Sequence, residues 1–300
     1  MNPTVRQKRL PRFRRSASPP PICLTPRDLQ ILEWIHRCRF LTREQIQRLL
    51  FTPGAESSCK RRLTLLFHNS YVGRLFLPLR NAYGASRAVY YLDRAGVRLL
   101  AHTRRLEAGL TERPWREGER EEVFLSHTLD INEVRIAFTL ACRQRGLKLE
   151  WLDERTLRRL DVRQRLRDPV TAAVILPDAY FTIGEGDAAD GFALEVDRST
   201  VPERRMRARM TAYGEWAASG TYRRRLPAAS LRVLFAITSW DRDGQRLAHL
   251  KRWCEEEGGR SLFWFVDGRH LAAADVLVDP VWLVAGRNEP LKLPLGAAHL

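Results

Sequence analysis

The sequence predicts a chain of the α+β or α/β class with two domains, a small helical domain that ends in a β-hairpin and a larger mixed sheet flanked by helices. Within residues 24–93 the spacing of apolar residues changes from the 3.6-residue period of a helix to the two-residue period of a strand. From residue 123 onward, helical and strand segments alternate. Residues 104–122 between them are charged and aperiodic, which is typical of a linker. An apolar share of 44% over 300 residues is enough for a hydrophobic core in each domain.

Residues 1–22 are basic and contain no acidic residue. The basic side chains are followed by the run "SPPP", and they are Arg6, Lys8, Arg9, Arg12, Arg14 and Arg15. Such a segment buries too little apolar surface to offset the entropy of ordering it. We therefore expect a disordered basic arm that adds non-specific phosphate contacts, with an inert tail as the alternative.

Residues 23–103 contain three short helical segments in tandem. Thr25 precedes Pro26, as an N-cap precedes a first helical position, and Thr42 and Gln45 have the spacing of a capping box. The third segment, residues 57–70, begins with two serines that we expect to cap it. Its apolar stripe predicts three buried residues, Leu63, Leu66 and Phe67.

Two runs with the two-residue period of a strand follow, residues 73–79 and 87–93, on either side of a turn that contains Asn81 and Gly84. This pattern predicts a β-hairpin. A closing helix is expected after Asp93, its N-cap. Three helices and a hairpin make a winged helix. We expect its third helix to enter the major groove of double-stranded DNA while the hairpin meets the backbone or minor groove. The predicted contacts are Lys60, Arg61, Arg62 and Thr64 on the outer face of the helix, which also carries His68, with Arg80 and Arg87 near the hairpin tip. A winged helix that makes only protein contacts is the alternative.

The charge balance also favours DNA. The chain has 51 Lys and Arg against 35 Asp and Glu, a net charge of +16, which favours a nucleic acid partner over a membrane, although GC-rich coding also enriches arginine. No secretory signal and no apolar stretch near 18 residues is present, and the five cysteines are scattered, so a cytoplasmic location without disulfides or zinc is expected. The phosphate-loop motif is absent, so no nucleotide cofactor is expected.

Residues 123–286 form the second predicted domain, with the order helix, three strands, helix, strand, helix, strand. Asp178 follows Pro177 in the second strand, and Glu195 and Asp197 lie two positions apart in the third. Alternate side chains of a strand share a face, so those two acids would project together. With Glu133 on the preceding helix, they predict a Mg²⁺ or Mn²⁺ site, in which the ion polarises a phosphoryl oxygen and supplies hydroxide. The alternative is a set of ion pairs with Arg198, Arg204 or Arg205.

Several stretches resemble the replication-relaxation family of bacterial and plasmid-borne proteins, over about residues 24–286. They are "LTPRDLQILEWIHRCRFLTREQIQRLLF", "YYLDRAGVRLLA", "HTLDINEVRIAF" and "LEVDRST" followed by "RARMTAY". The resemblance implies a winged-helix DNA-binding domain, a restriction-endonuclease-like domain of the PD-(D/E)xK group over residues 123–286, and a C-terminal tail over residues 287–300. It also implies a role in plasmid replication control or DNA relaxation.

By this resemblance Asp178 matches the acid of the PD element, Glu195 the acid of the third strand, and Glu133 the acid of the helix. The lysine that would activate water is replaced by Asp197, and a lysine on the next helix would fall near Arg209. Arginine stays protonated and cannot act as a base, so Arg209 would only stabilise charge beside the catalytic acids.

The leading hypothesis is therefore a DNA-binding protein whose second domain is a nuclease-like clamp or a platform for partners, with phosphates lined by Arg204, Arg205, Arg207 and Arg209. The partner is double-stranded DNA, with a homodimer or a replication or mobilisation protein as further partners. The alternatives are a Mg²⁺- or Mn²⁺-dependent endonuclease that nicks DNA and a winged-helix transcriptional regulator.

Overall fold

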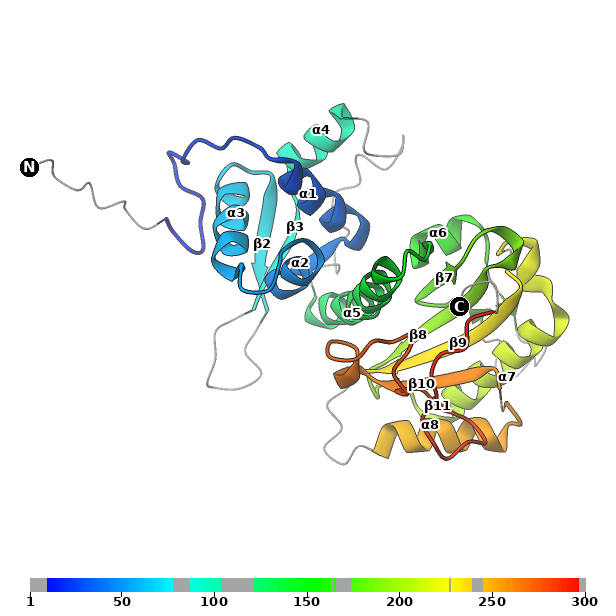
Figure 1. The fold of residues 1–300 in the computed structure, drawn as a ribbon. Helices are drawn as coiled ribbons and strands as arrows, with labels where there is room; N and C mark the ends of the chain where they lie inside the picture. Colours follow the sequence, from blue (N-terminus) through cyan, green and yellow to red (C-terminus); the bar gives the residue numbers. More distant parts are fainter. Residues whose placement is uncertain are drawn as a thin grey trace, which may run out of the picture. The chain divides into compact units, whose positions relative to one another are not determined.

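The computed structural model describes residues 10–77, 87–103, 121–162, 164–165, 174–226, 228–238, 245–259 and 261–296 (Figure 1). The chain divides into two compact units, Met1–Leu129 and Asp130–Leu300. Both contain helices and a sheet, which confirms the predicted α+β or α/β class. The division falls inside α5 (Glu122–Gln144). Of the predicted linker, residues 104–120 lie outside the described residues.

Among its described residues, unit 1 contains four complete helices, the start of α5, and a three-stranded antiparallel sheet in the order β1-β3-β2. Its elements are, in chain order, α1 (Pro26–Cys38), β1 (Phe40–Thr42), α2 (Arg43–Leu50), α3 (Glu56–His68), β2 (Val72–Phe76), β3 (Ala88–Leu92) and α4 (Arg94–His102). Three helices followed by a β2–β3 hairpin is the element order expected of a winged helix. The tip of this hairpin, residues 78–86 with Arg80, lies outside the described residues.

Local sequence determines where the first two helices begin. Thr25 caps α1 in a capping box with Asp28, with Pro26 at the first helical position, and Thr42 caps α2 in a capping box with Gln45. Asp93 caps α4 as predicted. The predicted serine cap of α3 is wrong: the N-cap residue is Ala55, and no side chain makes a capping hydrogen bond there.

The core of unit 1 is made of buried apolar residues from α1, α2, α3 and the sheet. The apolar side chains predicted for α3, Leu63, Leu66 and Phe67, are all buried. His68 was expected on the outer face with the DNA contacts, but it is buried, because the N-terminal segment covers the end of α3.

Residues 10–22, part of the predicted basic arm, contact unit 1 through Arg15 and Ser16. The Arg15 Nε donates to the carbonyl of Phe67 at 2.9 Å, and its guanidinium pairs with Asp93. The Ser16 amide donates to Nδ1 of His68 at 3.0 Å. The last carbonyls of a helix have no partner within the helix, so a donor-rich segment can order itself against them. Composition alone predicts disorder because it carries no information about the acceptors on α3, the Phe67 carbonyl and Nδ1 of His68. Residues 1–9 lie outside the described residues.

Unit 2 is built on a six-stranded mixed sheet in the order β11-β10-β9-β8-β7-β4. The strands are β4 (Leu149–Asp153), β7 (Ala179–Ile183), β8 (Asp190–Asp197), β9 (Ser230–Ile237), β10 (Phe263–Asp267) and β11 (Leu283–Val284). β8, β9 and β10 run parallel, whereas β4, β7 and β11 pair with their neighbours in antiparallel fashion. The prediction of a mixed sheet flanked by helices is confirmed.

The two faces of this sheet carry separate apolar cores. On one face α5 contributes Phe138, which packs with Phe192 and other residues of β7, β8 and β9. On the other face α7 (Glu203–Ser219) and α8 (Gln245–Glu256) cover the sheet, and Met210 and Trp253 belong to that core (Figure 1). Ala193 of β8 faces this second core, so the alternation along the strand directs Glu195 and Asp197 to the side of α7 and α8.

The second predicted strand, residues 172–183, is divided at Pro177. Its first part, β6 (Val174–Ile175), pairs with β5 (Gln164–Arg165) in a separate ladder, and β7 begins after Asp178. Proline lacks the N–H that a sheet ladder requires, which explains the break. Further short elements were not predicted: α6 (Glu154–Arg159), β11, and the 3₁₀ helices η1 (Gly186–Ala188), η2 (Thr221–Arg224) and η3 (Gly268–His270).

The predicted C-terminal tail, residues 287–300, belongs to unit 2 as far as residue 296. Leu293 is buried in the core beneath α5, and the amide of Gly296 donates to Oδ2 of Asp190 at 2.6 Å. Among the described residues, no helix combines the length and the apolar character needed to cross a membrane.

Candidate functional site

The centre of the candidate site is Glu195, which lies on β8 with its side chain under α7. It is 3% exposed, and both of its oxygens have a partner. Oε2 accepts from Nη1 of Arg209 at 2.6 Å, and Oε1 accepts from the hydroxyl of Tyr213 at 2.6 Å. Arg209 and Tyr213 are four residues apart on α7 and therefore share a face. Burial, and after it the charge of Glu195, raises the pKa of Tyr213 well above the usual value of a phenol, so its hydroxyl stays a donor.

Asp178 immediately precedes β7, next to Glu195 on the neighbouring strand. The β7–β8 register pairs Ala179 with Leu194, and Oδ2 of Asp178 accepts from the Val196 amide at 2.8 Å. The charge of Glu195 is the main cause that raises the pKa of Arg209; Asp178 and Asp197 add to it, while burial opposes it. Arg209 therefore lies in the combined field of three carboxylates.

Asp197 has a different partner, which the sequence did not suggest. Arg246 of α8 donates to it through two nitrogens, Nε to Oδ2 at 2.7 Å and Nη2 to Oδ1 at 3.1 Å. The same Nη2 also donates to the carbonyl of Val201 at 2.9 Å. This fork geometry is the strong form of an arginine–carboxylate pair, and Asp197 is only 4% exposed. Asp197 is thus a link between β8 and α8.

The ion pairs do form, but with other arginines than the three proposed from the sequence. Arg198 pairs with Asp130 at 3.3 Å, and Arg204 and Arg205 are exposed at the start of α7. The acids of β8 are paired with arginines, as the alternative prediction expected, but the partners differ. Glu195 pairs with Arg209, one helical turn after Arg205 on α7. Asp197 pairs with Arg246 of α8, 49 residues later in the sequence.

The predicted metal set is not brought together. Glu133 lies on α5, the helix that covers the opposite face of the sheet from Glu195. In the part of the chain that the structure describes, no group of three or more His, Cys, Asp or Glu side chains is arranged to hold a metal ion. Mg²⁺ requires free oxygen ligands in octahedral geometry, and the Glu195 oxygens already have donors. The residues present therefore do not fit a Mg²⁺ or Mn²⁺ site.

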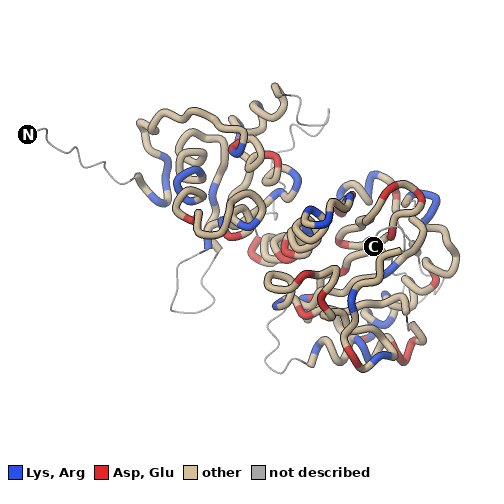
Figure 2. The backbone as a smooth tube through the Cα atoms, in the orientation of Figure 1, with Lys and Arg blue, Asp and Glu red and all other residues tan. Residues whose placement is uncertain are grey.

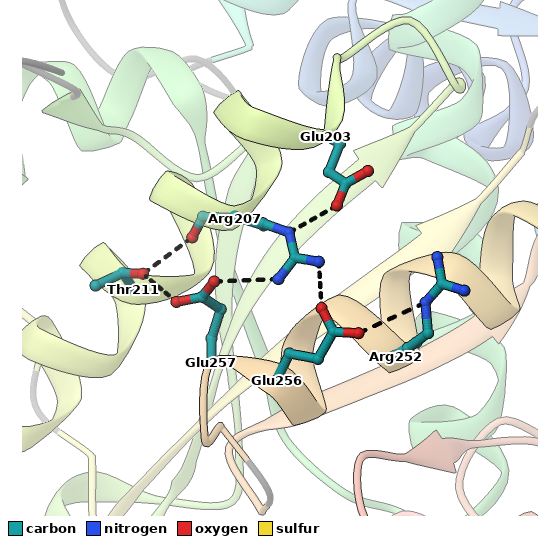
Figure 3. Close-up of polar contacts among 6 residues, drawn as sticks. All are labelled: Glu203, Arg207, Thr211, Arg252, Glu256 and Glu257. Atoms are coloured by element: carbon teal, nitrogen blue, oxygen red, sulfur yellow. Dashed lines mark hydrogen bonds and ion pairs between the residues drawn. The ribbon is translucent and has the colours of Figure 1, made fainter.

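Arg207 was expected to contact phosphates beside this site, but it has three carboxylate partners (Figure 3). Its Nε donates to Glu203 at 2.8 Å, and its two other nitrogens contact Glu256 and Glu257 at the end of α8. Thr211 also contacts Glu257. This exposed network links α7 to α8 and leaves Arg204 and Arg205 as the exposed arginines at the start of α7.

The predicted DNA contacts of α3 divide into two groups. Lys60 and Arg61 are exposed, and Thr64 is half-buried with its hydroxyl donating to the Lys60 carbonyl at 2.8 Å. Arg62 instead turns inward: its Nε donates to Oδ1 of Asp28 at 2.9 Å, and the Asp28 side chain is 0% exposed. Arg62 is thus a structural residue of unit 1, and the prediction that it contacts DNA does not match its position.

Arg87, immediately before β3, is exposed. Lys and Arg positions lie on both units, interspersed with Asp and Glu (Figure 2). The basic surface predicted for the helix and hairpin is therefore represented, among the described residues, by Lys60, Arg61 and Arg87.

Three residues of these clusters were not found from the sequence: Asp28, Tyr213 and Arg246. Tyr213 could have been predicted from the sequence: it lies four residues after Arg209 on the same predicted helix and therefore shares its face, and this helix follows the strand that carries Glu195. Asp28 and Arg246 had none, since each pairs with a residue more than thirty positions away.

Comparisons with known proteins identify a family. A model of the replication-relaxation family matches residues 32–227. The comparison with curated proteins gave no match. Among solved structures, the restriction endonuclease FokI matches 82% of this chain with 13% identity and a TM-score of 0.31. FokI bound to DNA matches 83% of the chain with 14% identity and a TM-score of 0.27. The chain spans less than half of these FokI chains, 42% and 45%.

Proposed function

The chain belongs to the replication-relaxation family, and from this membership we propose that it binds duplex DNA through α3 of unit 1 in the control of plasmid or mobile-element replication. The net charge of +16 supports a polyanionic partner. The order of helices and strands in unit 1 is the order in which a winged helix presents its third helix to a groove.

The observation that carries the proposal is the orientation of α3. Its apolar face, with Leu63 and Leu66, is fully buried, and this fixes the opposite face outward with Lys60 and Arg61 exposed. An arginine in the major groove can contact guanine through two hydrogen bonds, and a lysine can contact phosphate as a point charge. In this proposal Arg61 reads bases, Lys60 contacts the backbone, and Arg87 contacts the backbone beside the hairpin.

Unit 2 has a different part in the proposal. Arg204 and Arg205 are exposed in the first turn of α7, where the helix dipole also favours an anion. We propose that this end of α7 adds phosphate contacts or holds a replication or mobilisation protein. Catalysis is not assigned to unit 2, because the acids that hydrolysis would use are paired with Arg209 and Arg246.

The test is duplex binding measured by fluorescence anisotropy over a series of salt concentrations, with duplexes selected by the protein from a randomised pool. The affinity of the wild type should fall steeply with salt, with a log–log slope of roughly −5 for ~6 neutralised phosphates. Lys60→Ala should reduce the magnitude of that slope by about 1 for all sequences. Arg61→Ala should cost about 1–3 kcal/mol on the selected duplex and relax its sequence preference.

Arg98→Ala is the matched control, since Arg98 is an exposed arginine of α4 on the same unit. Its effect should be small. An affinity indifferent to salt, or equal losses in Arg61→Ala and Arg98→Ala, would remove α3 as the DNA-binding element.

The endonuclease alternative is tested separately, with supercoiled plasmid and Mn²⁺. The proposal expects the plasmid to stay supercoiled. Nicking that disappears in both Asp178→Ala and Glu195→Ala would replace the proposal for unit 2 with a metal-dependent nickase.

A further inference from the structure

We infer that the acidic site of unit 2 is closed to divalent cations because the guanidinium of Arg209 is already bound to Glu195, the carboxylate that a cation shared with the neighbouring Asp178 would need. This inference concerns unit 2 alone and does not depend on DNA binding by α3.

The first argument is occupancy. Both Glu195 oxygens lie 2.6 Å from a donor, Nη1 of Arg209 and the hydroxyl of Tyr213. One oxygen of Asp178 accepts from the Val196 amide at 2.8 Å. A Mg²⁺ ion would need oxygen ligands at about 2.0–2.1 Å in octahedral geometry. To bind there, the ion would have to displace a guanidinium from a carboxylate that is 3% exposed.

The second argument is charge. Asp197 is already compensated by the two donors of Arg246, which the Val201 carbonyl also anchors. Asp178 and Glu195 together match the charge of a divalent cation, and Arg209 compensates one of these charges. Arginine cannot lose its proton at any ordinary pH, so this compensation persists. An incoming divalent cation would therefore be repelled by a fixed positive charge beside the two carboxylates.

The third argument is access. The Arg209 side chain is 38% exposed, whereas the side chain of Glu195, to which it is bound, is only 4% exposed. Shortening or neutralising residue 209 would therefore open the carboxylates to solvent from that side. The site should become a cation site when this one positive charge is removed.

The experiment measures Mn²⁺ binding to the full-length protein by calorimetry and by the electron paramagnetic resonance signal of free Mn²⁺. The wild type should show no saturable binding that depends on Glu195. Arg209→Ala and Arg209→Gln should each gain one saturable Mn²⁺ site that binds at least tenfold more tightly than any site of the wild type. Adding Glu195→Gln to either variant should abolish this new site. The side-chain amide introduced by Arg209→Gln keeps a hydrogen-bond donor for Glu195, so this variant guards against a failure of Arg209→Ala to fold.

Two controls separate charge at this position from charge in general. Arg209→Lys keeps the positive charge and should stay closed to Mn²⁺. Arg205→Ala removes an exposed arginine one turn earlier on α7 and should gain nothing. Saturable Mn²⁺ binding by the wild type that Glu195→Gln abolishes would overturn the inference, and so would folded Arg209→Ala and Arg209→Gln proteins that bind no Mn²⁺.

Discussion

Replacing Arg62 by alanine should destabilise unit 1 through the buried Asp28. Arg62 joins α3 to the first turn of α1, and it also donates to the carbonyl of Cys23 at 3.1 Å. Removing one partner of a buried ion pair costs about 3–5 kcal/mol because the other charge is left without compensation. Asp28 keeps its hydrogen bonds from the amide and hydroxyl of Thr25, at 2.7 and 2.8 Å. We therefore expect the lower end, about 3 kcal/mol, which is a roughly 100-fold larger equilibrium constant for opening.

The same pair has a pH dependence. Burial alone would raise the pKa of Asp28, but the hydrogen bond from Arg62, helped by those from Thr25, lowers it below 3.8. A carboxyl group with a lowered folded-state pKa contributes stability that is complete above its unfolded-state value and is lost as pH falls through the folded-state value. The wild type should therefore lose this contribution progressively as pH falls through and below the usual range of an aspartate carboxyl. Arg62→Ala lacks this contribution at every pH, so the difference in stability between the wild type and the variant should shrink as pH falls.

Hydrogen exchange of the amides of α1 and α3, followed by mass spectrometry, measures the effect within unit 1 alone. The control is Arg61→Ala, one residue earlier and exposed, which should change stability by no more than about 0.5 kcal/mol. Exchange in Arg62→Ala that equals the wild type, together with a loss of DNA affinity like that of Arg61→Ala, would refute the structural role of Arg62.

Two other substitutions should give contrasting results in thermal unfolding. Gly96→Ala in α4 places a Cβ 2.2 Å from the carbonyl oxygen of Tyr71, so the helix must shift, and we expect a loss of about 1–3 kcal/mol; an unchanged midpoint would show that α4 moves freely. Arg207→Ala removes three glutamate contacts from an exposed network (Figure 3). Surface ion pairs contribute little and are screened by salt, so its midpoint at 0.5 M salt should match the wild type; a large drop there would mean that the network is effectively buried.

Backbone-determined features were predictable from the sequence. The Thr25 and Thr42 caps depend on side chains within three residues of each other. The shared face of Glu195 and Asp197 follows from the geometry of any strand. Both acids do project to the side of α7 and α8. The break at Pro177 was also available, since proline cannot continue a ladder, although the whole segment was read as one strand.

Tertiary partners were not predictable. Arg61 and Arg62 are adjacent arginines on an amphipathic helix, and only the position of Asp28, 34 residues earlier, makes one structural and leaves the other exposed. Glu133 was predicted as the helix acid of the site because it precedes the strand acids in the sequence, on a helix. Order alone does not tell which face of the sheet a helix covers, and α5 covers the face away from Glu195.

The arrangement around β8 connects these points. Where the family resemblance leads one to expect a lysine, β8 carries Asp197, and the positive charges come from α7 and α8 instead. A lysine in a buried site can shift its pKa and exchange a proton, whereas arginine cannot. Arg209 and Arg246 thus preserve the charge balance that holds helices and sheet together, and Asp197, which stands in the place of the lysine, is held in an ion pair with Arg246. These two ion pairs are the reason why our proposal for unit 2 includes no hydrolysis.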